Sequence, residues 1–268
     1  MTRRGLTLVE LMIALVVFGI LGTALMRLMI SNSRFVSRQE ALLEARQNAR
    51  AAMHLLSTEL RMVTDGNALR AAAPDSVTVR IPYVFGVICE LNTAVIMPAD
   101  SVISASAIQG GIAYRSAAGG YVFDSTVTMT MGGLAGHCTY DSIRVVPGGA
   151  YVTLSHFYLA PVGTVFYMFQ RVTYKFAPSA LLPGRRALWR RVGAAPPEEL
   201  LAPFADSARF AFLTGTRLTV QASPPPLSLI QGLELRLIAE SERPPTGQPA
   251  PTQYALMPRI KFVNRPIQ

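Results

Sequence analysis

The feature that most constrains the fold is an unbroken apolar run of 21 residues, over residues 6–26. The run contains a single charged residue, Glu10. A helix of this length is about 31 Å long at 1.5 Å per residue, which matches the hydrocarbon core of a bilayer. A carboxylate inside a membrane-spanning helix costs a few kcal/mol. Glu10 therefore needs a role that offsets this cost.

The residues directly before the apolar run are a basic pair and a glycine, Arg3-Arg4-Gly5. Glu10 is the fifth residue counted from Leu6. This pattern resembles the N-terminal segment of type IV pilins and pseudopilins, although that family usually has Phe where this chain has Leu6. In that family a prepilin peptidase cuts after the glycine and methylates the new amine. The resemblance implies cleavage between Gly5 and Leu6, and N-methylation of Leu6.

The resemblance also implies a location and a set of partners. Arginines flank the run on both sides, so charge counting does not decide its orientation. The family resemblance implies a single-pass inner-membrane protein with a cytoplasmic N-terminus and a periplasmic head, which later joins a pilus at the cell surface. The implied partners are other pilin subunits, the prepilin peptidase, the inner-membrane assembly platform and, before assembly, membrane lipid. Glu10 is implied to pair with the freed amine of a neighbouring subunit.

An amphipathic pattern continues the helix beyond the apolar run. Apolar residues recur there in steps of three and four. They are Leu42, Ala45, Ala49, Met53, Leu56, Leu60 and Val63. The sequence Asp65-Gly66-Asn67 predicts the end of the helix. We therefore expect a leader over residues 1–5, a helix over 6–64 (transmembrane over 6–30, amphipathic over 31–64) and a β-rich head over 65–268.

From Asp75 onward, apolar and polar residues alternate with a period of two, which predicts half-buried strands. The segments concerned are 76–81, 126–131, 152–155 and 233–237, and further strands are expected over 164–176, 229–240 and 254–263. A loop around Pro244-Pro245 is expected to join the last two strands. The segment Pro196-Pro197-Glu198-Glu199-Leu200-Leu201 is interpreted as a short helical turn. The sequence thus predicts an α+β, type IV pilin-like fold with a long helix packed on a β-rich head.

Two cysteines, Cys89 and Cys138, form an even pair in a domain expected to face an oxidising compartment. A disulfide between them is predicted, and two buried thiols are the alternative. A bridge would close a loop of about fifty residues and contribute about 4 kcal/mol on the chain-entropy model. His137 lies beside Cys138, but no CxxC or HxxxH spacing accompanies it, so no metal site is expected.

Composition limits the remaining classes of function. Half of the residues are apolar and 15% are charged, which argues against a disordered chain. The formal net charge is +9, almost all of it from arginine. The densest basic group comprises Arg185, Arg186, Arg190 and Arg191. Because the other arginines are scattered, we interpret the charge as a solvated surface and keep DNA as a weaker alternative partner.

The sequence shows no motif of a hydrolase, a P-loop protein, a zinc protease or a dinucleotide-binding protein. We therefore expect no enzyme and no cofactor. Trp189, next to two arginines, could stack on a ligand, and a half-buried position on a strand is the simpler interpretation. The segments 171–174, 187–191 and 233–238 resemble, in texture, large minor pilins of the PilW type and J-type pseudopilins of type II secretion.

These observations favour a structural minor pilin of a type IV pilus, placed in an initiation or tip complex. Three alternatives stay open: a pseudopilin of type II secretion, a DNA-uptake minor pilin, and a membrane-anchored periplasmic binding domain. The last belongs to a different class, because it requires neither peptidase cleavage nor partner subunits.

Overall fold

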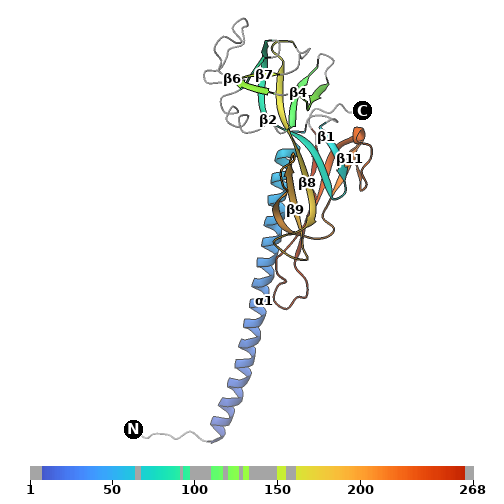
Figure 1. Cartoon of the computed structure of the whole chain (residues 1–268). Helices are drawn as coiled ribbons and strands as arrows, with labels where there is room; N and C mark the ends of the chain where they lie inside the picture. Colours follow the sequence, from blue (N-terminus) through green and yellow to red (C-terminus); the bar gives the residue numbers. More distant parts are fainter. Residues whose placement is uncertain are drawn as a thin grey trace.

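The computed structural model describes residues 8–63, 68–90, 93–96, 110–116, 120–126, 129–132, 150–154 and 161–262. Its first element, α1 (Leu8–Leu60), is one helix of 53 residues, about 80 Å long at 1.5 Å per residue. No proline interrupts it, and Gly19 and Gly22 lie within it. Figure 1 shows that its second half lies against the head while its first half projects away. The predicted end signal at residues 65–67 lies outside the described residues.

The head is a mainly β structure. Its described strands are β1 (Leu69–Ala73), β2 (Ser76–Glu90), β3 (Thr93–Ile96), β4 (Gly110–Arg115), β5 (Tyr121–Asp124), β6 (Met129–Gly132), β7 (Ala150–Leu154), β8 (Val165–Pro178), β9 (Arg186–Val192), β10 (Glu198–Phe204), β11 (Arg209–Thr214), β12 (Thr219–Gln221), β13 (Ile230–Glu240), β14 (Gln253–Leu256) and β15 (Arg259–Lys261). A short 3-10 helix, η1 (Leu227–Leu229), precedes β13. One long helix followed by a β-rich head confirms the predicted α+β, type IV pilin-like fold.

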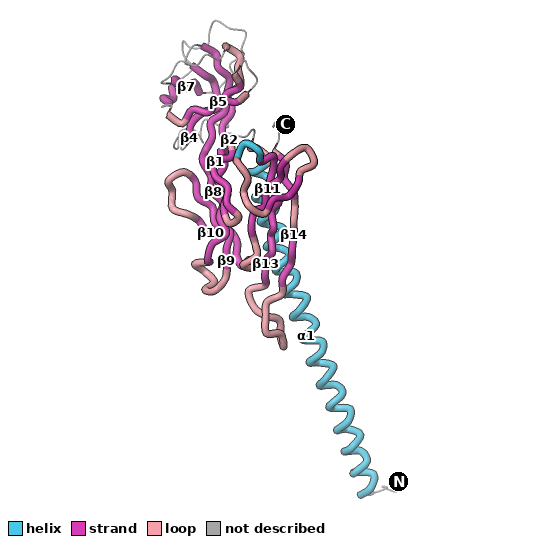
Figure 2. Tube along the Cα trace, turned by 90° about the vertical axis from the view of Figure 1, so that its right-hand side faces the viewer, coloured by secondary structure: helices cyan, strands magenta, loops and turns pink. Residues whose placement is uncertain are grey.

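The strands form one continuous antiparallel network. Its main path runs β12-β11-β13-β10-β9-β8-β2-β3-β7-β6, with β1 beside β2, β4 beside β8 and β5, and β14 and β15 beside β13. The long strands β2 and β8 pair from Ser76↔Lys175 to Val87↔Val165. They connect the part of the head beside α1 to an upper part that contains β4 and β7 (Figure 1). Figure 2 shows β13 and β14 running along the second half of α1.

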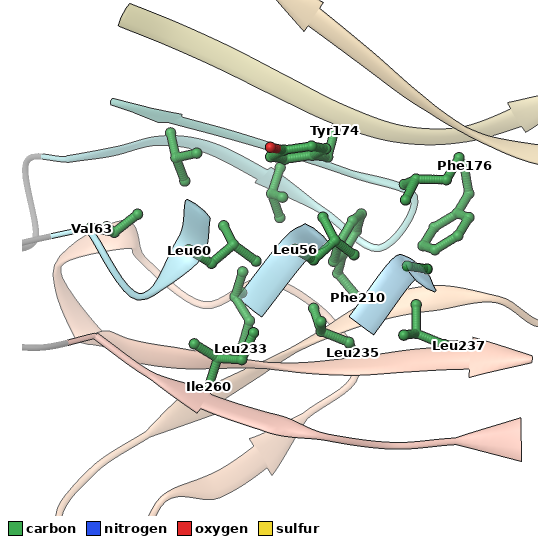
Figure 3. Close-up of a cluster of buried hydrophobic side chains, with 14 of the residues drawn as sticks. Leu56, Leu60, Val63, Tyr174, Phe176, Phe210, Leu233, Leu235, Leu237 and Ile260 are labelled. Carbon is green, nitrogen blue, oxygen red and sulfur yellow. The ribbon is translucent and has the colours of Figure 1, made fainter. Parts of the chain in front are cut away.

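The lower part of the sheet has one buried face and one outward face. Val77, Val79, Val172, Tyr174 and Phe176 alternate along β2 and β8 and are buried. Together with Leu188, Phe210 and the leucines of β13 they form the main core around α1. Figure 3 shows Tyr174, Phe176, Phe210 and the β13 leucines around Leu56 and Leu60 of the helix. The intervening residues of β2 and β8 point to the opposite face. Each fully buried leucine or phenylalanine contributes about 1.5–3 kcal/mol through its removal from water.

A second, smaller cluster supports the upper part of the head. It consists of Ala113, Tyr167 and Phe169, with Tyr121 and Phe123 packed against it. The Arg80 guanidinium lies 4.6 Å from the ring centre of Phe123 and 4.8 Å from that of Phe169. Arg80 is 7% exposed. Its cation–π contacts join the upper cluster to the long strand β2.

Most predicted strands are present, with two differences. The expected strand over 254–263 is divided into β14 and β15, which both pair with β13. The predicted helical turn over 196–201 is wrong, because Glu198 and Glu199 begin β10 and pair with Arg190 and Trp189 of β9. Hydrogen bonding to β9 outweighs the local helix-start preference of the two prolines.

Candidate functional site

The first half of α1 is an apolar surface that the chain itself leaves uncovered. Its large apolar side chains are exposed without interruption from Leu8 to Val36, including Phe18 at 79% and Met29 at 74%. Among the described residues, α1 is the one helix long and apolar enough to cross a membrane, as judged by length and composition. An exposed apolar face of this size requires lipid or other protein helices as its environment.

Glu10 lies in the first turn of α1. It is the one charged residue between Leu8 and Met26. An acidic side chain in the first turn interacts favourably with the positive end of the helix dipole. The predicted cleavage site, Gly5 and Leu6, lies outside the described residues. The structure thus places Glu10 at the tip of the projecting helix, far from the head (Figure 1).

Three arginines lie on α1 near the point where its exposed half gives way to its docked half. Arg27, Arg34 and Arg38 lie on one side of the helix, where they line a hollow of ≈ 440 Å³ with Ile30 and Phe35. Arginine side chains at the end of a membrane-spanning helix extend toward the lipid headgroups. Arg27 directly follows the apolar run over residues 6–26, and Arg34 and Arg38 lie about two and three helical turns further along.

The second half of α1 is docked on the sheet through small residues. Ala45, Ala49 and Ala52 are each 0% exposed, and Leu56 and Leu60 continue the same stripe. Alanine lets a helix approach a sheet closely, so little space remains between the backbones. The predicted stripe differs at two positions. Leu42 is 38% exposed and Met53 is partly buried, while Ala41 and Ala52 take the inward positions.

A polar clasp holds the upper end of α1 to the sheet. The Tyr174 hydroxyl donates a hydrogen bond to Glu59 of the helix, and Arg190 of β9 forms an ion pair with the same carboxylate at 3.2 Å. Burial raises the pKa of Tyr174, and the Glu59 charge adds to this effect. The phenol therefore stays protonated and keeps donating to Glu59. Sequence analysis missed this clasp, since its members are separated by 115 and 131 residues.

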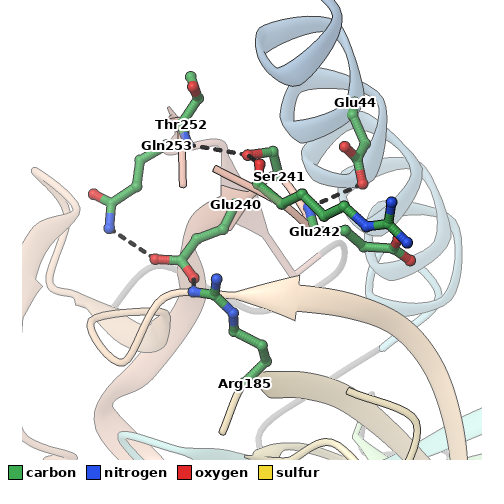
Figure 4. A network of polar contacts seen from close by, with 8 residues as sticks. Glu44, Arg185, Glu240, Ser241, Glu242, Thr252 and Gln253 are labelled. Atoms are coloured by element: carbon green, nitrogen blue, oxygen red, sulfur yellow. Dashed lines mark hydrogen bonds and ion pairs between the residues drawn. The ribbon is translucent and has the colours of Figure 1, made fainter. Parts of the chain in front are cut away.

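The lower contact is made by the connection between β13 and β14. Glu44 accepts a hydrogen bond from the Glu242 backbone N–H at 3.0 Å, and Ser37 Oγ accepts one from the Thr246 N–H at 2.9 Å. Figure 4 shows how this connection is fixed at its base. There Arg185 pairs with Glu240 at 2.8 Å, and the Ser241 hydroxyl accepts the Thr252 N–H. Two separate sets of polar contacts therefore frame the alanine stripe.

The cysteine and metal predictions stay open. Cys89 is 1% exposed in β2, and its expected partner, Cys138, lies outside the described residues, as does His137. No group of three or more His, Cys, Asp or Glu side chains suited to a metal ion is found among the described residues. The disulfide remains a prediction.

Comparison with known proteins finds a relationship at the N-terminus alone. Residues 1–26 match the family model described as the prokaryotic N-terminal methylation motif. No curated protein and no solved structure matches the chain. The match covers the basic pair, Gly5, Leu6, Glu10 and the apolar run. It supports a type IV pilin-like prepilin and concerns the same helix that the structure leaves uncovered.

Proposed function

We propose that this chain, whose first 26 residues match the N-terminal methylation motif, is a structural subunit of a type IV pilus or a related pseudopilus. One observation carries the proposal. The methylation motif starts a helix whose apolar half is exposed to its full length, while its other half is docked on a head. A fibre of such subunits buries the exposed half among neighbouring helices. An isolated anchor would bury it in lipid alone.

In this proposal, the peptidase cuts between Gly5 and Leu6 and methylates Leu6. The protein then spans the inner membrane once, with a cytoplasmic N-terminus and a periplasmic head. The assembly platform transfers it from lipid to the fibre. Glu10 pairs with the amine of a neighbouring subunit, which neutralises the carboxylate in an apolar bundle and sets the axial register. The chain acts as a structural component and not as a catalyst.

The finer proposal is a minor subunit in the initiation or tip complex. It rests on the large β head, whose sequence pattern resembles that of large minor pilins and J-type pseudopilins. A type II secretion pseudopilin and a DNA-uptake pilin share the same helix chemistry, so the partner subunits recovered with the chain distinguish them. The disulfide between Cys89 and Cys138 is part of the same proposal, and a thiol titration of the unreduced, denatured protein tests it.

The decisive experiment is mass analysis of the N-terminus of the membrane-extracted protein. We expect a mature chain that starts at methylated Leu6. Gly5→Val should block cleavage and leave a species about five residues longer in the membrane. Thr2→Val, in the same leader, serves as the matched control and should be processed normally. Equal processing of the wild type and Gly5→Val, or an uncut wild-type chain, supports the anchored-domain alternative.

A further inference from the structure

The outward face of the lower sheet carries a groove that the pilin proposal does not use. The groove has a volume of ≈ 540 Å³ and lies over β2, β8 and β9. The strand register arranges its side chains in two neighbouring rows. One row is Ser76, Lys175 and Trp189, and the other is Thr78, Thr173 and Arg191. Neighbouring strands are about 4.8 Å apart, so each row extends about 10 Å across the sheet.

Three cations line the groove, Lys175, Arg190 and Arg191. Arg190 is paired with Glu59 of α1, whereas Lys175 and Arg191 are available to a ligand. Lys175 lies 3.9 Å from Asp75, and the two side chains are 54% and 45% exposed. An ion pair this long and this exposed contributes little, so Lys175 can bind another anion. Arg191 is exposed, and no acid pairs with it among the described residues. Because Arg191 and Lys175 are diagonal neighbours on one face, both can reach a single carboxylate.

The third component of the groove is the indole of Trp189. Its Nε1–H donates to the Pro178 carbonyl oxygen at 3.1 Å, which satisfies the polar edge of the ring and fixes its orientation. Trp189 is partly exposed. Aromatic rings present a negative face, against which the weakly positive C–H groups of a sugar ring pack well. Pro178 and Pro197 add apolar walls at the rim of the groove.

Hydroxyl groups form the floor. Thr78 and Thr173 face each other, with their hydroxyl oxygens 2.9 Å apart, and Ser76 lies in the neighbouring row. Hydroxyl groups both donate and accept hydrogen bonds, so they match the hydroxyl groups of a sugar. A nucleic acid is less well matched, because its affinity depends on a long series of phosphate contacts. Two cations beside three hydroxyls and one fixed ring instead suit one charged sugar unit.

We infer that this groove binds an acidic sugar unit of a glycan. The sugar ring stacks on Trp189, its carboxylate binds Lys175 and Arg191, and its hydroxyl groups bond to Thr78 and Thr173. The groove lies on the face of the sheet opposite the buried residues that pack on α1. Occupation of the groove therefore leaves the assembly helix free, and the inference does not depend on processing or assembly.

Trp189 is the single tryptophan of the chain, so its fluorescence reports on the groove directly. The full chain, purified in detergent, is titrated with an oligogalacturonate and with its methyl-esterified form. We expect a saturable change with the acid, and binding about tenfold weaker for the ester, which has lost the charge-assisted hydrogen bonds. Arg191→Gln should weaken binding of the acid by a similar factor.

The control variant is Arg217→Gln, which removes the same charge from an exposed turn elsewhere on the head. It should bind like the wild type. A single-stranded oligonucleotide of equal charge completes the set of probes. Three results overturn the inference: no change with either sugar, equal losses in Arg191→Gln and Arg217→Gln, or tighter Arg191-dependent binding of the oligonucleotide. The last result would assign the groove to nucleic acid.

Discussion

The two halves of α1 belong to one continuous helix and have opposite relations to the rest of the chain. From Leu8 to Val36 its large apolar residues are exposed, whereas Ala45, Ala49 and Leu56 are fully buried against the sheet. The exposed half presents large apolar side chains throughout. The docked half buries alanines along its lower part and two leucines, Leu56 and Leu60, near its upper end. The head needs a close approach by the helix, and the exposed half offers large side chains to a partner outside the chain.

The comparison separates two kinds of effect that mutations can have. Changes in the docked half should alter the free energy of unfolding of the head. Changes in the exposed half should leave folding intact and alter insertion or assembly. Paired variants in the two halves of α1 can therefore separate assembly from folding.

The largest expected effect is on assembly, through Glu10. Glu10→Val should be processed and inserted normally, because it removes a charge from the membrane-spanning segment. It should be lost from fibres, because the neighbouring amine is left without a partner in an apolar setting. Glu10→Asp should be intermediate. The measurement is the amount of subunit in sheared surface fractions, with membrane levels as the control. Wild-type recovery of Glu10→Val would exclude Glu10 from inter-subunit pairing.

The second prediction compares two leucines of α1. Leu56→Ala removes a side chain from the main core and should lower the free energy of unfolding by about 2–5 kcal/mol. Leu43 is 53% exposed, so Leu43→Ala should change it by about 0.5 kcal/mol or less. Urea denaturation of the full chain in detergent, followed by Trp189 fluorescence, measures both. Similar losses in the two variants would contradict the docking of α1 through this face.

The third prediction concerns the alanine stripe. Ala49→Leu inserts a larger side chain where the helix meets the sheet, and overpacking of this kind costs about 1–3 kcal/mol. Ala24→Leu makes the same change in the exposed half and should leave the denaturation midpoint unchanged. The two midpoints are compared under the conditions of the leucine experiment. A stable Ala49→Leu would show that the helix and the sheet are more loosely packed than the structure indicates.

The smallest expected effect comes from the polar clasp. Tyr174→Phe removes the hydrogen bond to Glu59 and should cost about 1–2 kcal/mol at neutral pH. The pKa of Tyr174 is raised in the folded protein above its ordinary value of 10.0. The contribution of its protonated form is therefore complete below pH 10 and is lost as the pH rises through the folded pKa.

Alkaline unfolding measures this dependence. Between pH 10 and 12 the wild type should lose stability more steeply than Tyr174→Phe, so the two curves should converge. Tyr254→Phe is the matched control, because Tyr254 also packs beside α1, where the Arg46 guanidinium lies 5.8 Å from its ring centre. Parallel curves for wild type and Tyr174→Phe would argue against the clasp.

The elements that sequence analysis predicted well are those with strong periodicity. The apolar run and the alternation of Val77 and Val79 follow from single-element patterns, and β8 was expected from its aromatic residues. The predicted stripe was displaced by one position at Leu42 and at Met53, because periodicity gives weight to large apolar residues and little to alanine. The strand β10 was missed because its conformation depends on pairing with Trp189 of β9, which local preferences do not contain.

The residues of the candidate site also divide into those that a local pattern indicates and those that only the folded chain brings together. Glu10 was predicted from its place in a short motif. The structure places it in the first turn of α1, and its role in assembly stays a prediction. The clasp of Glu59, Tyr174 and Arg190 was not identified, because a helix and two strands, α1, β8 and β9, must fold together before these residues meet. At the groove, sequence analysis considered only that Trp189 could stack on a ligand. The two rows of the groove emerge from the register of β2, β8 and β9.

The contacts between α1 and the head are spread along the helix axis, from Ser37 near the lower loop to Glu59 near the upper end. These positions are 22 residues apart, which is about 33 Å of helix. A pulling force on the head, directed along this axis, acts on all of these contacts at once and not on one after another. The head is thus loaded in shear, the geometry in which a ladder of weak bonds resists tension best. The contacts along α1 therefore share such a load with the main chain that joins α1 to β1.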